Sequence, residues 1–432
     1  MKALEDWQSI TLGEVCRFIG GNGFREELQG RKDGDYPFIK VSDMELPGNK
    51  KMIVQANNWI DEKTRKNEAF KAFPETSVVF AKVGAALLLN RRRILTRPTC
   101  IDNNMMAAVP NGIDPLFLYY VLSDIDFADF VQSGAVPSIN QGQISGISFD
   151  LPKPNEQTKI AEILSTVDRA IEQTEALIAK QQRIKTGLMQ DLLTRGIDEN
   201  GNLRSEQTHK FKDSPLGRIP VEWETASVSS VLAQPPKNGY SPVESNNWNG
   251  IYMLGLGCLT AEGFKPNQLK YAPKTDRRIE GALLLQGDFL ISRSNTRALV
   301  GLVGIIRALG EPCIYPDLMV RLQFGVEVSV DYMEQVFMSP AIRRQIETAA
   351  TGTSGSMVKI SAAVIKELLF SKPPIEEQLT ILSILHSKAE GIRKTRSSLA
   401  KLRSLKTALM QDLLTGKKRV TPLLNDKEVM NG

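Results

Sequence analysis

The sequence predicts an α+β protein made of two similar halves, each a mixed domain followed by one long helix, with the two helices paired as an antiparallel coiled coil. Three observations support this prediction. A ten-residue segment occurs twice, each copy closes a proline-free stretch of about forty residues with helical apolar spacing, and the residues before each stretch form short β-prone runs separated by Gly, Asn and Pro.

The length of 432 residues is too great for one ordinary domain. The expected parts are a first domain over 1–152, a first long helix over 153–195, a linker over 196–215, a second domain over 216–372, a second long helix over 373–416 and a tail over 417–432.

The repeat is strongest at the ends of the two long stretches. Lys185–Thr194 and Lys406–Thr415 are identical at nine of ten positions, at a separation of 221 residues. The same separation, without a gap, pairs Glu156-Gln157 with Glu377-Gln378. A gap-free match of this length indicates an internal duplication.

A second register, at a separation of 216 residues, covers the start of each half. It pairs Trp7 with Trp223, and Asn22-Gly23-Phe24 with Asn238-Gly239-Tyr240. The two halves therefore match at their start and end segments and differ in the residues between these segments.

The stretch over 155–194 carries apolar residues along one helical face, and Gly196 follows it as a stop signal; the copy over 375–415 ends at Gly416. A helix of about 38 residues is roughly 57 Å long, so one small domain cannot cover its apolar face. We expect the two helices to cover each other, and the alternative is two separate helices on the surface of a globular core. The stripe residues expected to make these contacts are Ile160, Ile163, Leu164, Ile171, Leu188, Leu192, Ile381, Ile384, Leu385, Ile392, Leu409 and Leu413.

The mixed domains contain short predicted elements. The β-prone runs are Tyr36–Val41, Ser77–Phe80, Ile251–Leu256, Asp288–Ile291 and Val300–Ile306, and short helices are expected over 115–132 and 331–347.

Composition limits the classes of function. Lys and Arg number 54 against 49 Asp and Glu, and the resulting net charge of +5 permits a nucleic-acid partner without demanding one. The four cysteines form no CxxC pair and only two histidines are present, which indicates neither a zinc site nor a redox motif. The chain has no signal-peptide pattern and no apolar run long enough for a membrane span, so we expect a cytoplasmic protein.

No catalytic motif stands out. The sequence has no phosphate-binding GxxxxGK[ST] loop, no HExxH and no strand–GxGxxG–helix frame. It also lacks the Asn/Asp-Pro-Pro-aromatic motif of amino-methyltransferases and a PD…(D/E)xK nuclease pattern. We therefore expect a non-catalytic chain with no cofactor or metal of its own.

Binding remains as the expected activity. Proteins that read duplex DNA use cations for phosphates and forked polar groups for base edges. Arg91–Arg93 form the main cationic cluster of the first half, with a solvated loop as an equal alternative, and Arg293, Asn295 and Arg297 follow a predicted strand in the second half. The Gly of each Asn-Gly pair is expected in a tight turn. The candidate DNA contacts are Asn22, Phe24, Lys40, Ser42, Lys82, Arg91, Arg92, Arg93, Arg97, Lys237, Asn238, Tyr240, Arg293, Asn295 and Arg297.

These features together resemble the specificity subunits of type I restriction–modification enzymes. The resemblance rests on Trp7, on the segment from Pro152 to Gln157 and on Leu188–Thr194, each with its counterpart in the second half: Trp223, Pro373 to Gln378 and Leu409–Thr415. The linker piece Phe211–Pro220 also looks like the family's entry to a second reading domain. The resemblance covers essentially the whole chain.

The resemblance implies two target-recognition domains that each read one half of a bipartite, asymmetric DNA site, with the helices setting the spacer. It implies two modification subunits that carry S-adenosylmethionine, dock on the helical regions and domains and methylate adenine at N6 in a flipped base. It also implies two restriction subunits that use ATP and Mg. The alternatives are a stand-alone DNA-binding regulator, a pure protein scaffold, a fusion enzyme or nuclease, and a system that only modifies DNA.

Overall fold

The computed structural model describes residues 6–131, 136–248, 250–273, 276–352 and 357–424. The chain forms two compact units, which we call unit 1 (residues 1–176 with 397–432) and unit 2 (residues 177–396). Each long helix therefore contributes one part to each unit, and each unit is described by itself below.

Unit 1 begins with a mixed domain whose helices are short. Its strands are β1 (Gln8–Thr11), β2 (Cys16–Gly20), β3 (Tyr36–Ile39), β4 (Met52–Ile53), β5 (Trp59–Ile60), β6 (Ala72–Phe73), β7 (Val78–Ala81), β8 (Arg93–Leu95), β9 (Thr99–Ile101), β10 (Met105–Pro110) and β11 (Ser148–Leu151). Its helices are α1 (Leu12–Val15), α2 (Glu62–Asn67), α3 (Ala85–Leu88), α4 (Pro115–Asp124) and α5 (Gln141–Ser145), followed by the long α6 (Pro154–Thr194).

Two sheets organise this domain, with strand orders β2-β10-β7-β8-β4 and β5-β3-β9-β6. The central strand β10 is buried along Met105–Val109 and pairs antiparallel with β2 and with β7. Helix α4 buries Phe117 and Tyr120 against this core. It ends at Asp124, short of the predicted 115–132, and residue 132 lies outside the described part of the chain.

Unit 2 repeats this plan with different strand lengths. Its strands are β12 (Phe211–Ser214), β13 (Gly217–Pro220), β14 (Glu224–Ser227), β15 (Leu232–Asn238), β16 (Tyr252–Leu254), β17 (Leu259–Thr260), β18 (Gly263–Phe264), β19 (Leu269–Tyr271), β20 (Phe289–Ser292), β21 (Ser294–Asn295), β22 (Val303–Ile305), β23 (Cys313–Ile314), β24 (Met319–Phe324), β25 (Val358–Lys359) and β26 (Leu369–Lys372). Its helices are α7 (Val330–Met338), α8 (Pro340–Ala349), α9 (Ala362–Glu367) and the long α10 (Ile375–Leu413).

The main sheet of unit 2 has the order β15-β24-β20-β22, with β24 in the place that β10 holds in unit 1. The helix predicted over 331–347 is split between α7 and α8. Pro340 lacks the amide proton that a continuous helix needs, and the Ser339 side chain caps the new helix by accepting from the Ile342 amide at 3.4 Å.

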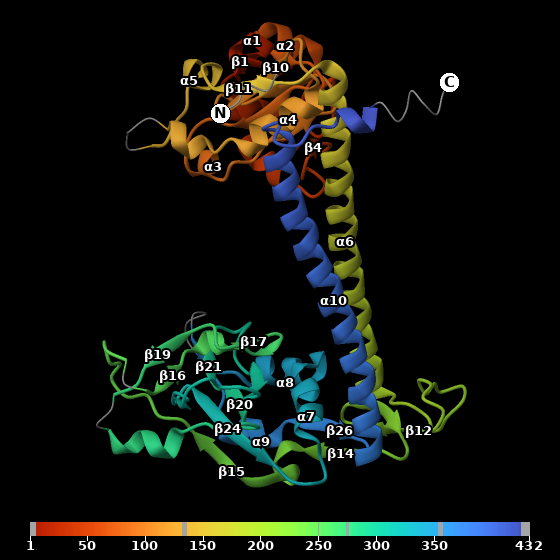
Figure 1. The fold of residues 1–432 in the computed structure, drawn as a ribbon. Coiled ribbons are helices and arrows are strands. Elements are labelled where there is room, and N and C mark those ends of the chain that lie inside the picture. Colours follow the sequence, from red (N-terminus) through yellow and green to blue (C-terminus); the bar gives the residue numbers. More distant parts are fainter. Residues whose placement is uncertain (1–5, 132–135, 249, 274–275, 353–356, 425–432) are drawn as a thin grey trace. The chain divides into compact units, whose positions relative to one another are not determined.

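The two long helices are the predicted ones, and their antiparallel pairing is confirmed (Figure 1). In unit 1, Asp168 of α6 pairs with Lys406 of α10 at 2.7 Å, and Glu175 pairs with Arg403 at 2.8 Å. Because the α10 partner comes earlier in the chain as α6 advances, the helices run in opposite directions.

The predicted stripe residues are all buried or half-buried, whereas other apolar residues of the two helices stay partly exposed. Most of the fully buried members lie near the helix ends, where they join the cores of the mixed domains, whereas Ile392, 5% exposed, lies near the middle of α10. Closer to the middle of the helices, Leu177 and Ile184 of α6 are 47% and 52% exposed, and Leu405 of α10 is 47% exposed. A pair of helices covers only the facing side of each stripe, so the flanking apolar residues stay open.

The repeated segment at each helix end has a structural role. Leu192 and Leu193 of α6 enter the core of unit 2, whereas Leu413 and Leu414 enter the core of unit 1. Both predicted glycine stops are confirmed, since Gly196 and Gly416 have φ angles of +63° and +67°, which suit glycine.

The segment expected to be a linker over 196–215 is mostly exposed and is anchored to unit 2 at Ile197 and Arg204. Ile197 is 4% exposed, and the side chain of Arg204 pairs with Glu377 at 2.5 Å. The segment then enters the β12–β13 hairpin, in which Phe211 pairs with Pro220. Its polar composition predicted a loop, but the ion pair and the buried Ile197 fix its path.

Candidate nucleic-acid interface

The two mixed domains share a frame that aligns their candidate contacts. In unit 1, Met105 of β10 faces Ala81 of β7, and in unit 2, Met319 of β24 faces Ser292 of β20. The next residues along, Lys82 and Arg293, are therefore equivalent, although no common sequence register had paired them. Each is half-buried.

The glycines that the sequence paired are not the equivalent ones. A Cβ on Gly239 would lie 2.3 Å from the carbonyl oxygen of Tyr315, and a Cβ on Gly21 would lie 2.2 Å from that of Ile101. A Cβ on Gly23 would meet nothing within 4 Å. Gly21 is thus the counterpart of Gly239, and both allow close backbone approach; the tight-turn expectation is wrong because neither Gly23 nor Gly239 has a positive φ.

The arginine cluster of the first half is mostly structural, which corrects the prediction. Arg92 is 3% exposed, donates to the carbonyl oxygens of Leu122 and Ile125 at 3.1 Å each, and stacks on Phe127 with 3.7 Å between the guanidinium carbon and the ring centre. Burial lowers its pKa to about 9. An arginine held in this way cannot reach DNA without unfolding its surroundings.

Arg93 is also withdrawn from the candidate contacts. Its guanidinium donates to the carbonyl oxygens of Asn49, Arg92 and Met44, the last two at 2.8 and 3.1 Å. Burial lowers its pKa. Arg91 pairs with Glu45 on the surface and Arg97 is exposed beside the ring of Trp59, so these two stay predictions.

Phe24 is half-buried and packs against a buried aromatic cluster, so its role as a DNA contact stays a prediction. Its ring stacks on that of Phe38 with centroids 3.8 Å apart, and Phe70 packs edge-on against both rings. The amide oxygen of Asn22 accepts from the Lys71 amide at 3.0 Å, and the amine of Lys40 donates to Gln29 at 3.0 Å. Both side chains are half-buried and stay candidates.

The remaining candidates lie at the surface. Tyr240 donates to Asp276 at 2.6 Å, and that bond raises the pKa of the tyrosine. Arg297 donates to the carbonyl oxygen of Glu347 at 2.9 Å, and Asn295 accepts from the next amide at 2.8 Å. Like Arg97, the candidates Ser42, Lys237, Asn238 and Arg297 are exposed.

The repeated Trp and Glu form a clamp at the start of each long helix. In unit 1 the indole of Trp7 donates to Glu156 at 3.3 Å, and Arg419 donates two hydrogen bonds to the same carboxylate at 3.0 and 2.9 Å. Glu156 is 1% exposed, so its charge is balanced almost entirely by Arg419.

Unit 2 has the same clamp. The indole of Trp223 donates to Glu377 at 2.9 Å, and Arg204 binds that carboxylate at 2.5 and 3.2 Å. The sequence had identified the Trp and Glu as repeated but missed both arginines, because Arg204 and Arg419 share no register with the repeat. The sequence did offer one signal: a glutamate that is buried beside a tryptophan needs a cation to balance its charge, so an arginine or lysine could have been sought for each glutamate.

The glutamine after each clamp glutamate ties the helix to the domain before it. Gln157 accepts from the Asp114 amide at 2.8 Å and donates to the Pro152 carbonyl at 2.8 Å. Gln378 makes the equivalent bonds to Ser329 at 2.9 Å and Pro373 at 2.9 Å. The Glu-Gln pair therefore belongs to the joint between domain and helix.

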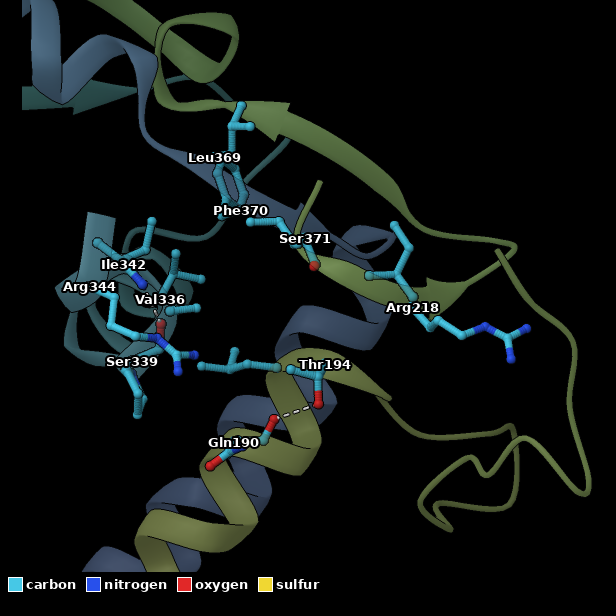
Figure 2. Close-up of a pocket in the computed structure, with 15 residues that line it drawn as sticks. Gln190, Thr194, Arg218, Val336, Ser339, Ile342, Arg344, Leu369, Phe370 and Ser371 are labelled. Atoms are coloured by element: carbon cyan, nitrogen blue, oxygen red, sulfur yellow. Dashed lines mark hydrogen bonds between the residues drawn. The ribbon is translucent and has the colours of Figure 1, made fainter. Parts of the chain in front are cut away.

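A small cavity of about 100 Å³ lies in unit 2 at the end of α6 (Figure 2). Gln190 and Thr194 of α6, Arg218 of β13, Arg344 of α8 and Ser371 of β26 contribute to its lining, together with the apolar side chains labelled in Figure 2, Val336, Ile342, Leu369 and Phe370. None of the candidate DNA contacts lines this cavity, so it gives no support to a catalytic or base-reading role there.

Metal and thiol chemistry find no support in the described part of the chain. No group of three or more His, Cys, Asp and Glu side chains within it could hold a metal ion. The four cysteines are buried and unpaired, and burial raises the pKa of Cys16, Cys100 and Cys313 to about 12. Among the described helices, none is both long and apolar enough to span a bilayer.

The fold defines a duplicated protein in which each of two similar mixed domains is joined to a long helix. Residues 4–181 match the family model described as the type I restriction modification DNA specificity domain. The chain is 22% identical, over 98% of its length and 95% of the relative's, to the specificity subunit of the type I restriction enzyme MjaVIII from Methanocaldococcus jannaschii. It is 26% identical, over 96% of its length and 90% of the relative's, to the specificity subunit of the type I restriction enzyme EcoKI from Escherichia coli.

Solved structures agree on the fold. The chain is similar, with a TM-score of 0.61 and 16% identity over 97% of its length and 100% of the other chain, to a chain of a structure that describes complex assembly and conformational transition of the type I R-M system. It is also similar, with a TM-score of 0.51 and 13% identity over 96% and 98% of the two chains, to the type I restriction–modification S subunit from M. genitalium. Residues 4–181 therefore resemble a type I DNA specificity domain, and the chain as a whole is similar in sequence and in fold to type I specificity subunits.

Proposed function

We propose that the chain reads a bipartite, asymmetric DNA site and directs partner subunits to it. The observation that carries this proposal is the repeated frame with different side chains at equivalent positions, such as Lys82 in unit 1 and Arg293 in unit 2. Two copies of one frame with identical side chains would read a symmetric site, whereas two copies with different side chains read two different half-sites.

The proposal assigns the chemistry to partners. Two modification subunits, which bind S-adenosylmethionine, methylate adenine at N6 in a base turned out of the duplex. Two restriction subunits use ATP and Mg to translocate and cut the DNA. The chain itself is non-catalytic and sets the spacer between the half-sites through its long helices.

The exposed apolar side chains of α6 support docking of a partner helix. Leu177 and Ile184 are seven residues apart, which places them on one face of the helix, and each is about half exposed. The relatives described above are specificity subunits of restriction enzymes, which fits a chain that works inside a larger complex.

The test is co-expression with a type I modification subunit in a host that lacks adenine methylation, followed by mapping of N6-methyladenine across the host DNA. We expect one bipartite motif, methylated once on each strand. A formed complex that methylates no motif would overturn the proposal in favour of a scaffold.

A stand-alone regulator is the second candidate. It would bind a specific duplex tightly without any partner, whereas the modest net charge of +5 over 432 residues favours DNA contacts shared with partner subunits. Titration of the isolated chain with the mapped motif separates the two, because only a regulator binds the motif tightly alone.

A further inference from the structure

Lys82 and Arg293 project from the same backbone position in the two units. The Lys82 amide donates to the Asn104 carbonyl at 2.9 Å, and its own carbonyl accepts from the Ile139 amide at 3.0 Å. In unit 2 the Arg293 amide donates to Leu318 at 2.9 Å, and its carbonyl accepts from Ile360 at 2.9 Å. These two hydrogen bonds fix the backbone of each residue in the same way, so the two side chains leave the backbone at equivalent positions in the two units.

The segment opposite each cation is equivalent as well. Val83 bridges to Ser138 in unit 1, and Ser294 pairs with Lys359 in unit 2. Two residues further on, Asn140 caps α5 by accepting from the Gln143 amide at 2.9 Å. Its counterpart Ser361, which lies 221 residues later in the chain, caps α9.

In unit 1 these segments enclose an open recess of about 490 Å³, which we call the Lys82 recess. Its polar lining comes from Lys82, Ser138, Asn140 and Gln141. The Lys82 amine lies over Gly20, where a Cβ would be 3.0 Å from the nitrogen. The glycine thus leaves room for the amine at the edge of the recess.

The side chains at the matched positions differ between the units while the backbone does not. Gln141 corresponds to Ala362, and Ser138 corresponds to Lys359. Among the described residues, neither Lys82 nor Arg293 makes a side-chain hydrogen bond or ion pair, in contrast to Arg92, which carbonyl oxygens hold. Both cations are therefore placed by the fold and left free to bind a ligand.

We propose that Lys82 and Arg293 are equivalent base-reading residues, and that each recognises the O6 and N7 acceptors of a guanine in its own half-site. This proposal rests on the proposed function. Lysine and arginine carry only donors, and the guanine major-groove edge is the base edge with two adjacent acceptors that such donors prefer. A half-buried cation beside polar side chains is better placed to contact a base edge than to contact a phosphate on the outside of the duplex.

The experiment compares Arg293→Ala, Lys82→Ala and the conservative Arg293→Lys with wild type in the complete complex with modification subunits. Exposed cations outside the two matched positions, Lys63→Ala in unit 1 and Arg344→Ala in unit 2, serve as controls. The readouts are the methylated motif in host DNA and the affinity for duplexes that differ at one base pair.

Each alanine variant is expected to relax one G·C position, by about ten- to hundred-fold in preference, and the two variants are expected to relax opposite halves of the motif. Arg293→Lys should lose part of the preference at the same position, and the controls should keep the motif. Uniformly weaker binding to all duplexes, with a salt slope lower by about one, would show phosphate contacts and overturn the proposal, as would an unchanged motif. Failure of the proposed function is visible separately, because wild type would then give no bipartite motif.

Discussion

Removal of the arginine from the unit 1 clamp is expected to destabilise that unit strongly. In Arg419→Ala, the carboxylate of Glu156, which is 1% exposed in the native chain, keeps only the Trp7 indole as a side-chain partner, at 3.3 Å. A buried charge that loses its partner typically costs about 3–5 kcal/mol. Because the Arg419 side chain is 24% exposed, water can enter its place, and we expect about 3 kcal/mol.

The sign of the coupling makes this prediction specific. Glu156→Gln alone removes the charge but keeps the shape, and the partly exposed Arg419 can be hydrated, so its expected cost is about 1–2 kcal/mol. Adding Glu156→Gln to Arg419→Ala removes the unpaired charge. The double variant should therefore be more stable than Arg419→Ala alone, with a coupling of about 2 kcal/mol.

The measurement is hydrogen exchange of the complete chain in a urea series, followed separately for the first turns of α6 and of α10. The α10 turns belong to unit 2, whose own clamp uses Arg204 and Glu377, and they serve as the internal control. The reasoning fails if Arg419→Ala costs less than about 1 kcal/mol in unit 1, or if the double variant is less stable than Arg419→Ala.

The remaining predictions concern the helices, the backbone and the thiols. Leu177→Ser with Ile184→Ser should weaken binding of a modification subunit about thirty-fold without lowering the free energy of unfolding, measured by calorimetry of complex formation and by urea unfolding. Burial favours the protonated form of Asp168, but hydrogen bonds from Lys406 and Tyr120 and the charges of Lys406 and Lys51 outweigh it and lower its pKa. Unit 1 should therefore lose stability as the pH falls below about 4, the pKa of a free aspartate, and on through the lowered pKa of Asp168. Asp168→Asn should abolish that acid-side loss in unfolding curves recorded at several pH values. Gly21→Ala should destabilise unit 1 by more than about 2 kcal/mol, because its Cβ would meet a carbonyl oxygen at 2.2 Å, whereas Gly23→Ala should change the midpoint of thermal unfolding little. All four cysteines should resist a thiol reagent in the native state and react only on unfolding, because burial raises the pKa of each.

The long helices could be predicted because their signals are local. The helical spacing of apolar residues between a proline and a glycine predicted a helix over 155–194, and α6 runs from Pro154 to Thr194. The separate surface helices that were the alternative are excluded by the ion pairs between α6 and α10 within unit 1. Exposure of Leu177 could not be predicted, since it depends on how much of the stripe one partner helix covers.

The site could be predicted only in part because its determinants are far apart in the sequence. Arg92 and Arg97 look alike as neighbours in a basic segment, yet Arg92 meets the carbonyl oxygens at the end of α4 and Arg97 stays exposed. Lys82 and Arg293 became equivalent only through the strand registers, since insertions in the middles of the halves had removed any common separation.

The clamps also explain why the sequence boundaries between domain and helix do not coincide with the units. Arg419 follows α10 but completes the clamp at the start of α6, and Arg204 follows α6 but completes the clamp at the start of α10. Val420, 1% exposed, joins the core of unit 1 together with the end of α10. Each mixed domain therefore needs the residues that end the helix of the other half, and neither sequence repeat contains all the partners that its own buried glutamate requires.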